Sequence, residues 1–262
     1  MTTDDEQKHE GENSVPQGER LVRFLAHSGV ASRRHAETLI SDGHVQINGM
    51  TITTPGTRIN AQQDRVTVDG KAVQPVEKHS YVMLHKPVGY VSTAHDPQGR
   101  PTVLELLPEE LHRQRLYPVG RLDLDTSGLL LLTNDGEFAL RLTHPRYATE
   151  KHYEALVKGH PSSQALQALR QGVVITEDDG SHYRTTPGQV RVLRDRGTHS
   201  WLALTIHEGH KRQVRRMLEV VGYPVRQLVR VAVDTLALKD LPVGSWRYLT
   251  EDEVRVLMKD KL

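Results

Sequence analysis

The sequence of 262 residues contains no cysteine, only two phenylalanines and no long uninterrupted hydrophobic run. Without cysteine, the chain can form neither a disulfide framework nor a thiolate metal site. No apolar stretch approaches the roughly 18 residues that a membrane-spanning helix needs. We therefore expect a cytoplasmic protein with no membrane partner. The length allows one large domain and one small domain, each with a hydrophobic core of its own.

The net charge is only +1, but the charges are spread unevenly along the chain. Residues 1–18 carry five carboxylates against one lysine, which predicts a disordered acidic tail. By contrast, the segment from Lys211 to Arg230 carries six basic residues against a single acid, Glu219. Such a basic segment indicates a nucleic-acid-binding surface, although a solvated helix face would have the same composition.

Residues 19–70 are predicted to form a small α/β domain. Two segments with helical spacing come first, and Ser32 is a good N-cap for the second. A hairpin with an Asn-Gly turn at Asn48 and a further strand follow. Arg33 and Arg34 stand at the start of the second helix, where guanidinium and backbone N–H groups can bind phosphate together.

The order of Ser-Arg-Arg, helix and Val-x-Ile-Asn-Gly in "GVASRRHAETLISDGHVQINGM" resembles the S4 RNA-binding domain. The alternative is a generic helix–hairpin unit with surface arginines. Residues 71–80 are polar, contain Pro75 and are predicted to be a linker. Residues 81–262 combine alternating, strand-like segments with segments of helical spacing. This mixture predicts an α+β domain built on a mostly antiparallel mixed sheet.

The stretch "YPVGRLDLDTSGLLLLTNDGE" places two carboxylates, Asp123 and Asp125, just before Leu129–Leu132, which we predict to be a buried strand. A charge near a core is costly unless it is paired or used. A nearby arginine such as Arg121 favours the ionised carboxylate, which suits a nucleophile or base rather than a general acid. On these residues alone, catalysis and a structural arginine–aspartate pair both stay open.

Five segments occur in order along the second domain: "LHKPVGYVST", "GRLDLDTSGLLLLTNDGEFALRLTHP", "KHYEALVKG", "IHEGHKRQVRRMLEVVGYPVRQLVR" and "LPVGSWRYLTEDE". Together they resemble the pseudouridine synthases, and more narrowly the ribosomal RNA branch of the RsuA/RluB type. With the S4-like region, the resemblance covers the chain from about Glu19 to the C-terminus. It implies an isomerase that converts a uridine of ribosomal RNA into pseudouridine without a metal or a cofactor.

The resemblance implies a role for each matching residue. Asp123 would be the catalytic aspartate, which attacks the uridine or abstracts a ribose proton. Tyr153 would stack on the target base, and Arg215 would pair with Asp123, with Arg212 and Arg216 as alternatives. The cationic residues predicted to bind RNA are Arg33, Arg34, Lys86, Arg121, Lys211, Arg212, Arg216 and Arg230.

The form of the S4-like segment favours 23S rRNA as the partner and substrate of a monomeric enzyme. A 16S rRNA pseudouridine synthase and a catalytically inactive ribosome-assembly protein are the alternatives. A glycoside hydrolase that uses Asp123 and Asp125 as its pair is disfavoured, because two positions in one loop are too constrained to flank a sugar.

Overall fold

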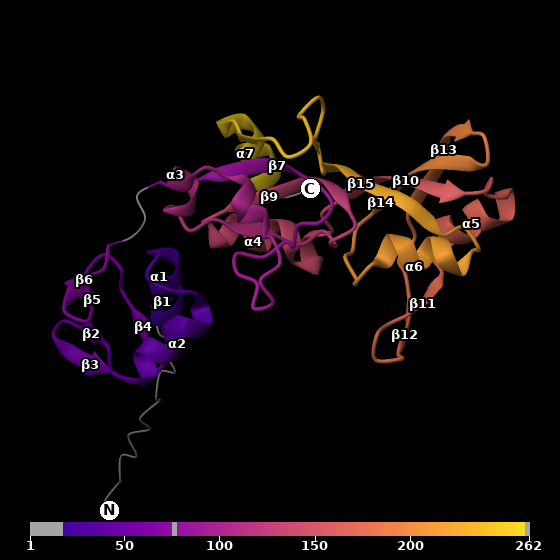
Figure 1. Ribbon diagram of the computed structural model, residues 1–262. Coiled ribbons are helices and arrows are strands. Elements are labelled where there is room, and N and C mark those ends of the chain that lie inside the picture. The colour runs from indigo at the N-terminus through magenta and orange to yellow at the C-terminus, as the bar shows by residue number, and fades with distance from the viewer. Residues whose placement is uncertain (1–17, 75–77, 260–262) are drawn as a thin grey trace, which may run out of the picture. The chain divides into compact units, whose positions relative to one another are not determined.

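The computed structural model describes residues 18–74 and 78–259 of the protein. The chain divides into two compact units, residues 1–78 and residues 79–262 (Figure 1). The predicted acidic tail lies outside the described residues except for Gly18, and so does Pro75 of the predicted linker. Each unit is considered by itself.

The first unit packs two helices against small antiparallel sheets. Its core consists of buried residues from both helices and from the strands, among them Leu21, Ile40 and Val45. The hydroxyl of Ser32 accepts the His35 N–H at 3.2 Å and so caps the second helix as predicted. The elements are β1 (Glu19–Arg20), α1 (Leu21–His27), α2 (Arg33–Ser41), β2 (Val45–Ile47), β3 (Met50–Ile52), β4 (Arg58–Ile59), β5 (Val66–Val68) and β6 (Lys71–Ala72).

Strand β6 begins where the sequence predicted a linker. Lys71 pairs with Val68 across a tight turn whose two central residues, Asp69 and Gly70, both have positive φ. An Asp-Gly pair favours this kind of hairpin turn. The hairpin therefore extends the sheet, in the order β3-β2-β5-β6, into the first residues of the predicted linker.

The second unit is built on a nine-stranded sheet in which β13-β14-β10-β15-β9-β7-β17 form a continuous order. All of its neighbours are antiparallel except β9 and β15, so the predicted α+β class with a mostly antiparallel mixed sheet is confirmed. β16 pairs with β15, and β8 pairs with β9. The strands are β7 (Tyr81–Lys86), β8 (Tyr117–Val119), β9 (Ser127–Thr133), β10 (Lys151–Lys158), β13 (Gln189–Arg196), β14 (His199–Ile206), β15 (Val225–Val233), β16 (Leu236–Ala237) and β17 (Trp246–Tyr248).

Helices cover both faces of this sheet. The helical elements are η1 (Val103–Leu106), α3 (Glu109–His112), α4 (Gly136–Thr143), η2 (Pro145–Tyr147), α5 (Ser163–Gln171), α6 (Gln213–Val220) and α7 (Glu251–Met258). Figure 1 shows α4 and α7 near β7 and β9, and α5 and α6 at the end formed by β10, β13 and β14. None of the helices in the described ranges is long and apolar enough to cross a membrane.

The leucine run confirms the predicted buried strand. Leu129 and Leu131 join a cluster with Phe138 of α4, whereas Leu130 and Leu132 join the larger cluster that includes α5 and α6. Successive residues of a strand point to opposite faces. Because both faces of β9 are covered, the strand is apolar without alternation.

Strand β9 approaches β15 so closely that only glycine fits at their contact. Gly128 lies opposite Arg230, its φ is +113°, and a Cβ there would lie 2.3 Å from the Arg230 carbonyl oxygen. On its other edge, β15 pairs with β10. The parallel pairing of β9 with β15 therefore brings the loop that precedes β9, with Asp123 and Asp125, close to Tyr153 on β10.

Candidate active site

The loop of residues 120–126, between β8 and β9, carries Asp123 and is held by backbone contacts. The Ser92 hydroxyl donates to the Leu122 carbonyl oxygen at 2.9 Å and accepts the Leu122 N–H at 3.1 Å. The Thr126 N–H donates to the Asp123 carbonyl oxygen at 3.1 Å and closes a turn. The loop thus fixes the backbone position of Asp123 from two sides.

Lys86 anchors the same loop through its ammonium group. It is fully buried at the end of β7, and its Nζ donates to the carbonyl oxygens of Pro87 (3.0 Å), Asp123 (3.1 Å) and Thr126 (2.8 Å). Burial lowers the pKa of Lys86 to about 8, although Asp123 and then Asp125 oppose this shift. The ammonium group has no exposed surface and anchors the loop, so the structure gives Lys86 a different role from the predicted contact with RNA.

The Asp123 side chain is half-buried and lines a cavity of about 600 Å³. Coulombic attraction to Asp123 favours the charged forms of Lys86, Arg212 and Arg215. Within the described part of the chain, however, no ion pair joins Asp123 to a basic side chain. The Asp123 carboxylate therefore lines the cavity near three positive charges but forms no ion pair with any of them.

Tyr153 lines the same cavity as Asp123. It lies on β10, opposite Leu204 of β14 on one side and Arg230 of β15 on the other. Its side chain belongs to the large hydrophobic cluster, and only 9% of the residue is exposed. The ring is thus held by packing, and a planar base that entered the cavity could stack against it.

Arg230 lines the cavity and is buried, so it is not part of an exposed basic surface. It is 4% exposed, and its Nε donates to the Leu129 carbonyl oxygen at 2.8 Å. The prediction that Arg230 binds RNA therefore applies only inside the cavity. Its burial restricts it to contact with a nucleotide that has entered the cavity.

Asp125 holds two arginines of the basic segment. Arg212 donates to both Asp125 carboxylate oxygens, at 2.9 and 3.0 Å, and Arg215 Nη2 lies 3.3 Å from Asp125 Oδ2. Arg215 also donates to the Asp125 carbonyl oxygen at 2.7 Å. Burial opposes ionisation of Asp125, but the hydrogen bonds from Arg212 and the charge of Arg215 outweigh it and lower the pKa of Asp125.

This arrangement corrects the predicted pairing of Arg215 with Asp123. Arg215 and the alternative Arg212 pair with Asp125, and the other alternative, Arg216, pairs with Glu177 and Asp178. Asp125 therefore ties the loop to the start of α6, while Asp123 is left for the cavity.

The remaining predicted RNA-binding residues differ in how they are paired. Lys211 forms an ion pair with Asp178. Arg121 is exposed on the cavity rim, and no ion pair to it occurs among the described residues. Arg33 and Arg34 are exposed at the start of α2 in the first unit, also without an ion pair in the described ranges.

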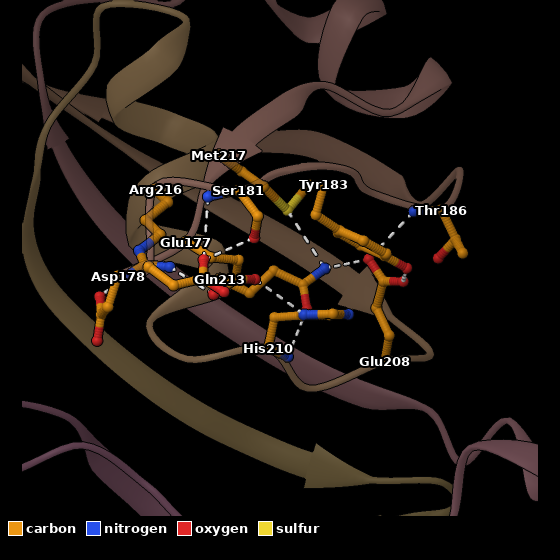
Figure 2. Close-up of polar contacts among 11 residues, drawn as sticks. Glu177, Asp178, Ser181, Tyr183, Thr186, Glu208, His210, Gln213, Arg216 and Met217 are labelled. Carbon is orange, nitrogen blue, oxygen red and sulfur yellow. Dashed lines mark hydrogen bonds and ion pairs between the residues drawn. The ribbon is translucent and has the colours of Figure 1, made fainter.

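Sequence reasoning missed a polar network between α6 and the hairpin of β11 (Val174–Thr176) and β12 (His182–Arg184), which Figure 2 shows. Glu208 accepts hydrogen bonds from the Tyr183 hydroxyl (2.7 Å), the Thr186 N–H (3.1 Å) and the Gln213 side chain. The rings of Tyr183 and His210 stack with centroids 3.8 Å apart. The acidic run "TEDDG" in the hairpin, opposite in charge to the basic segment, was the available signal.

No cluster of three or more metal-ligating side chains was found in the described residues. The family model for RNA pseudouridylate synthase matches residues 80–220, and the model for the S4 domain matches residues 19–64. Ribosomal large subunit pseudouridine synthase B of Bacillus subtilis (strain 168) is 44% identical over 241 residues, which cover 91% of this chain and 95% of that protein. An uncharacterized RNA pseudouridine synthase of Aquifex aeolicus (strain VF5) is 42% identical over 92% of this chain and 94% of its own.

A solved structure supports the same likeness. The crystal structure of a pseudouridylate synthase superposes with a TM-score of 0.66 at 30% sequence identity. The match covers 91% of this chain and 99% of that chain. It therefore extends over nearly the whole length of both proteins.

Proposed function

The chain belongs to the family of RNA pseudouridylate synthases, and we propose that it isomerises a specific uridine of 23S rRNA, in the large ribosomal subunit. The name of the similar Bacillus subtilis protein supports the large subunit as the target. The matched S4 domain supports RNA as the partner. The observation that carries the proposal is that Asp123 and Tyr153 line one cavity.

Asp123 is proposed to be the catalytic residue. The reaction breaks the bond between N1 of uracil and the ribose, turns the base and forms a bond from C5 to the same ribose carbon. The hydrogen on C5 leaves as a proton and N1 gains one, so nothing is oxidised or added. An ionised Asp123 would act by attacking the uridine or by abstracting a ribose proton. Such chemistry needs no metal or cofactor.

Tyr153 and Arg230 are proposed to receive the target nucleotide. A base inside a folded RNA must leave its stack before an enzyme can reach it. A cavity of about 600 Å³ is large enough for a nucleotide, and the Tyr153 ring offers a stacking surface. Arg215 would be a positioning residue, since it acts on Asp123 through Asp125 and the loop. We expect the enzyme to act as a monomer in the cytoplasm, where rRNA is available.

The proposal is tested with rRNA that carries tritium at C5 of uridine, because pseudouridine formation releases that tritium. The substrates are 23S and 16S transcripts and ribosomal particles from a strain that lacks the gene. We expect release from the large-subunit RNA alone. Asp123→Asn should release none while RNA binding persists, and Asp240→Asn, a change at an exposed aspartate, should match the wild type.

Each other result has a definite meaning. Turnover by the Asp123→Asn protein would refute the role of that carboxylate. Release from 16S rRNA alone would support the small-subunit alternative. RNA binding without release from any substrate would support the alternative of an inactive assembly protein.

A further inference from the structure

The turn between β11 and β12 places acidic side chains on the cations of the basic segment. Glu177 Oε2 lies 2.8 Å from Arg216 Nη1, and Glu177 Oε1 lies 2.9 Å from His210 Nδ1. Asp178 forms an ion pair with Arg216, as Figure 2 shows, and a second one with Lys211. Two cations that the sequence assigned to RNA are thus already neutralised within the protein.

These ion pairs lie at the rim of the cavity that holds Asp123. His210 and Lys211 both line that cavity. The side chains of Lys211 and Asp178 are 58% and 54% exposed, so water and salt reach their ion pair. Exposed ion pairs of this kind contribute little to the stability of the fold. An entering phosphate group could therefore replace Asp178 on Lys211 at small cost, whereas the Arg216–Glu177 pair is more buried, with side-chain exposures of 17% and 21%.

The hairpin does not depend on the acidic tip for its position. Its base is held by the stacking of Tyr183 on His210 and by the hydrogen bonds of Tyr183 and Thr186 to Glu208. The turn itself is closed by the Glu177 N–H, which donates to the Ser181 carbonyl oxygen at 2.8 Å. Loss of the tip charges should thus leave the hairpin folded.

We propose that Glu177 and Asp178 compete with RNA phosphates for Lys211 and Arg216, so that an RNA must displace these acids to contact the rim. An unrelated RNA makes phosphate contacts alone, so each contact it gains at the rim costs an internal ion pair. A target RNA also inserts a uridine beside Asp123 and Tyr153, and this added binding offsets the exchange. The inference rests on the proposed function in one respect, that RNA enters the protein across this rim.

The experiment compares the full-length wild type with the double variant Glu177→Gln/Asp178→Asn. The probes are labelled oligoadenylate and a labelled fragment of 23S rRNA, titrated over a range of salt concentrations. We expect the double variant to bind oligoadenylate more tightly, because phosphates then reach Lys211 and Arg216 without breaking an ion pair. Its salt dependence should steepen by about 0.7 in log–log slope for each cation released, because freed cations displace counterions from single-stranded RNA.

Asp179→Asn is the matched control. Asp179 carries the same charge on the same turn, but its hydrogen bonds go to Ser181 and not to a cation. It should bind both probes like the wild type. An equal gain in affinity in this control would mean that overall charge, rather than the ion pairs, is responsible, and would overturn the proposal.

Unchanged or weaker oligoadenylate binding by the double variant would also overturn the proposal, since the acids would then only hold the cations in place. The comparison is repeated in an Arg33→Ala/Arg34→Ala background, so that RNA bound by the first unit cannot hide the effect. Oligoadenylate contains no uridine, so its response tests the ion-pair exchange by itself. Absence of tritium release from 23S rRNA would instead count against the proposed function.

Discussion

Lys86 and Arg230 show how burial changes the use of a basic side chain. Both belong to segments that resemble RNA-modifying enzymes, and both were predicted to contact RNA. In the folded protein, Lys86 bonds to three carbonyl oxygens, two of them in the loop that carries Asp123. Arg230 bonds to the carbonyl oxygen of Leu129 within the sheet. The positive charge of each supports the architecture that surrounds Asp123.

Lys86→Met is expected to lower turnover far more than RNA affinity. Methionine fills a similar volume but donates no hydrogen bond, and an unsatisfied buried carbonyl costs about 1–3 kcal/mol. The loop would lose two of its anchors, and Asp123 would lose its fixed position. Turnover and binding are measured on the same RNA, with Lys158→Met, a change at an exposed lysine, as the control. Equal losses in turnover and affinity would contradict this role.

The pH dependence of Lys86 gives a separate prediction. Its pKa in the folded protein is about 8, against an ordinary value of 10.5. As the pH rises through about 8, the ammonium becomes an amine with two hydrogens for three carbonyl oxygens, so turnover should fall. Between pH 8 and 10.5 the unfolded chain binds the proton that the folded protein has lost, so the contribution of Lys86 to the free energy of unfolding should rise with pH. Denaturant titrations of the wild type and Lys86→Met over this range measure that difference, and a flat difference would disprove the assignment.

At the scale of elements, the parallel contact between β9 and β15 decides where the site forms. The two strands are far apart in the sequence, and their only described ladder residues are Val229 with Ser127 and Arg230 with Gly128. Strand β15 then carries β10 on its other edge. These two residue pairs therefore set the distance between the loop of residues 120–126, which carries Asp123, and β10, which carries Tyr153.

Gly128→Ala should destabilise the protein strongly. The positive φ alone costs a non-glycine residue about 1–3 kcal/mol, and the clash with the Arg230 backbone adds to this. Gly222→Ala isolates the strain, because Gly222 has a φ of +87° but no atom within 4 Å of the position that an added Cβ would take. Denaturant unfolding of both variants should show the larger loss of stability for Gly128→Ala. Equal losses would mean that the close approach of β9 to β15 is not required.

At the scale of the whole molecule, we expect RNA binding to draw on both units. The first unit offers Arg33 and Arg34 at the start of α2, whose N-cap is Ser32. The second unit offers Arg121 and the ion-paired cations at the cavity rim. Because phosphate contacts release counterions, binding should weaken as salt is added.

Arg33→Ala/Arg34→Ala is expected to weaken binding to every RNA tested and to make the salt dependence shallower, by about 1 in log–log slope for each phosphate that the variant no longer binds. Turnover at saturating RNA should change little, because these residues lie outside the unit that holds Asp123. Arg65→Ala removes one exposed charge from the same unit and is the control. Binding that stays flat with salt, or a weakening confined to one RNA sequence, would argue against phosphate contacts at these arginines.

Much of the local structure could be predicted from the sequence. Ser32 caps α2 as predicted, and its hydroxyl accepts the His35 N–H. The five ordered segments predicted the family, which the comparisons confirm. The placement of the linker boundary was less successful, because an Asp-Gly turn extends the first sheet by β6.

The sequence by itself determined the family and the fold class and pointed to Asp123 as the candidate catalytic residue, since caps, strand alternation and motif order depend on residues close together in the chain. Only the tertiary structure decided which acid each arginine meets. Arg212 and Asp125 are 87 positions apart, and Arg216 and Asp178 are 38 apart. Coulombic attraction depends on distance in space, and every carboxylate within reach competes for a given guanidinium. Spacing along the chain cannot rank these competitors until the sheet has brought them together.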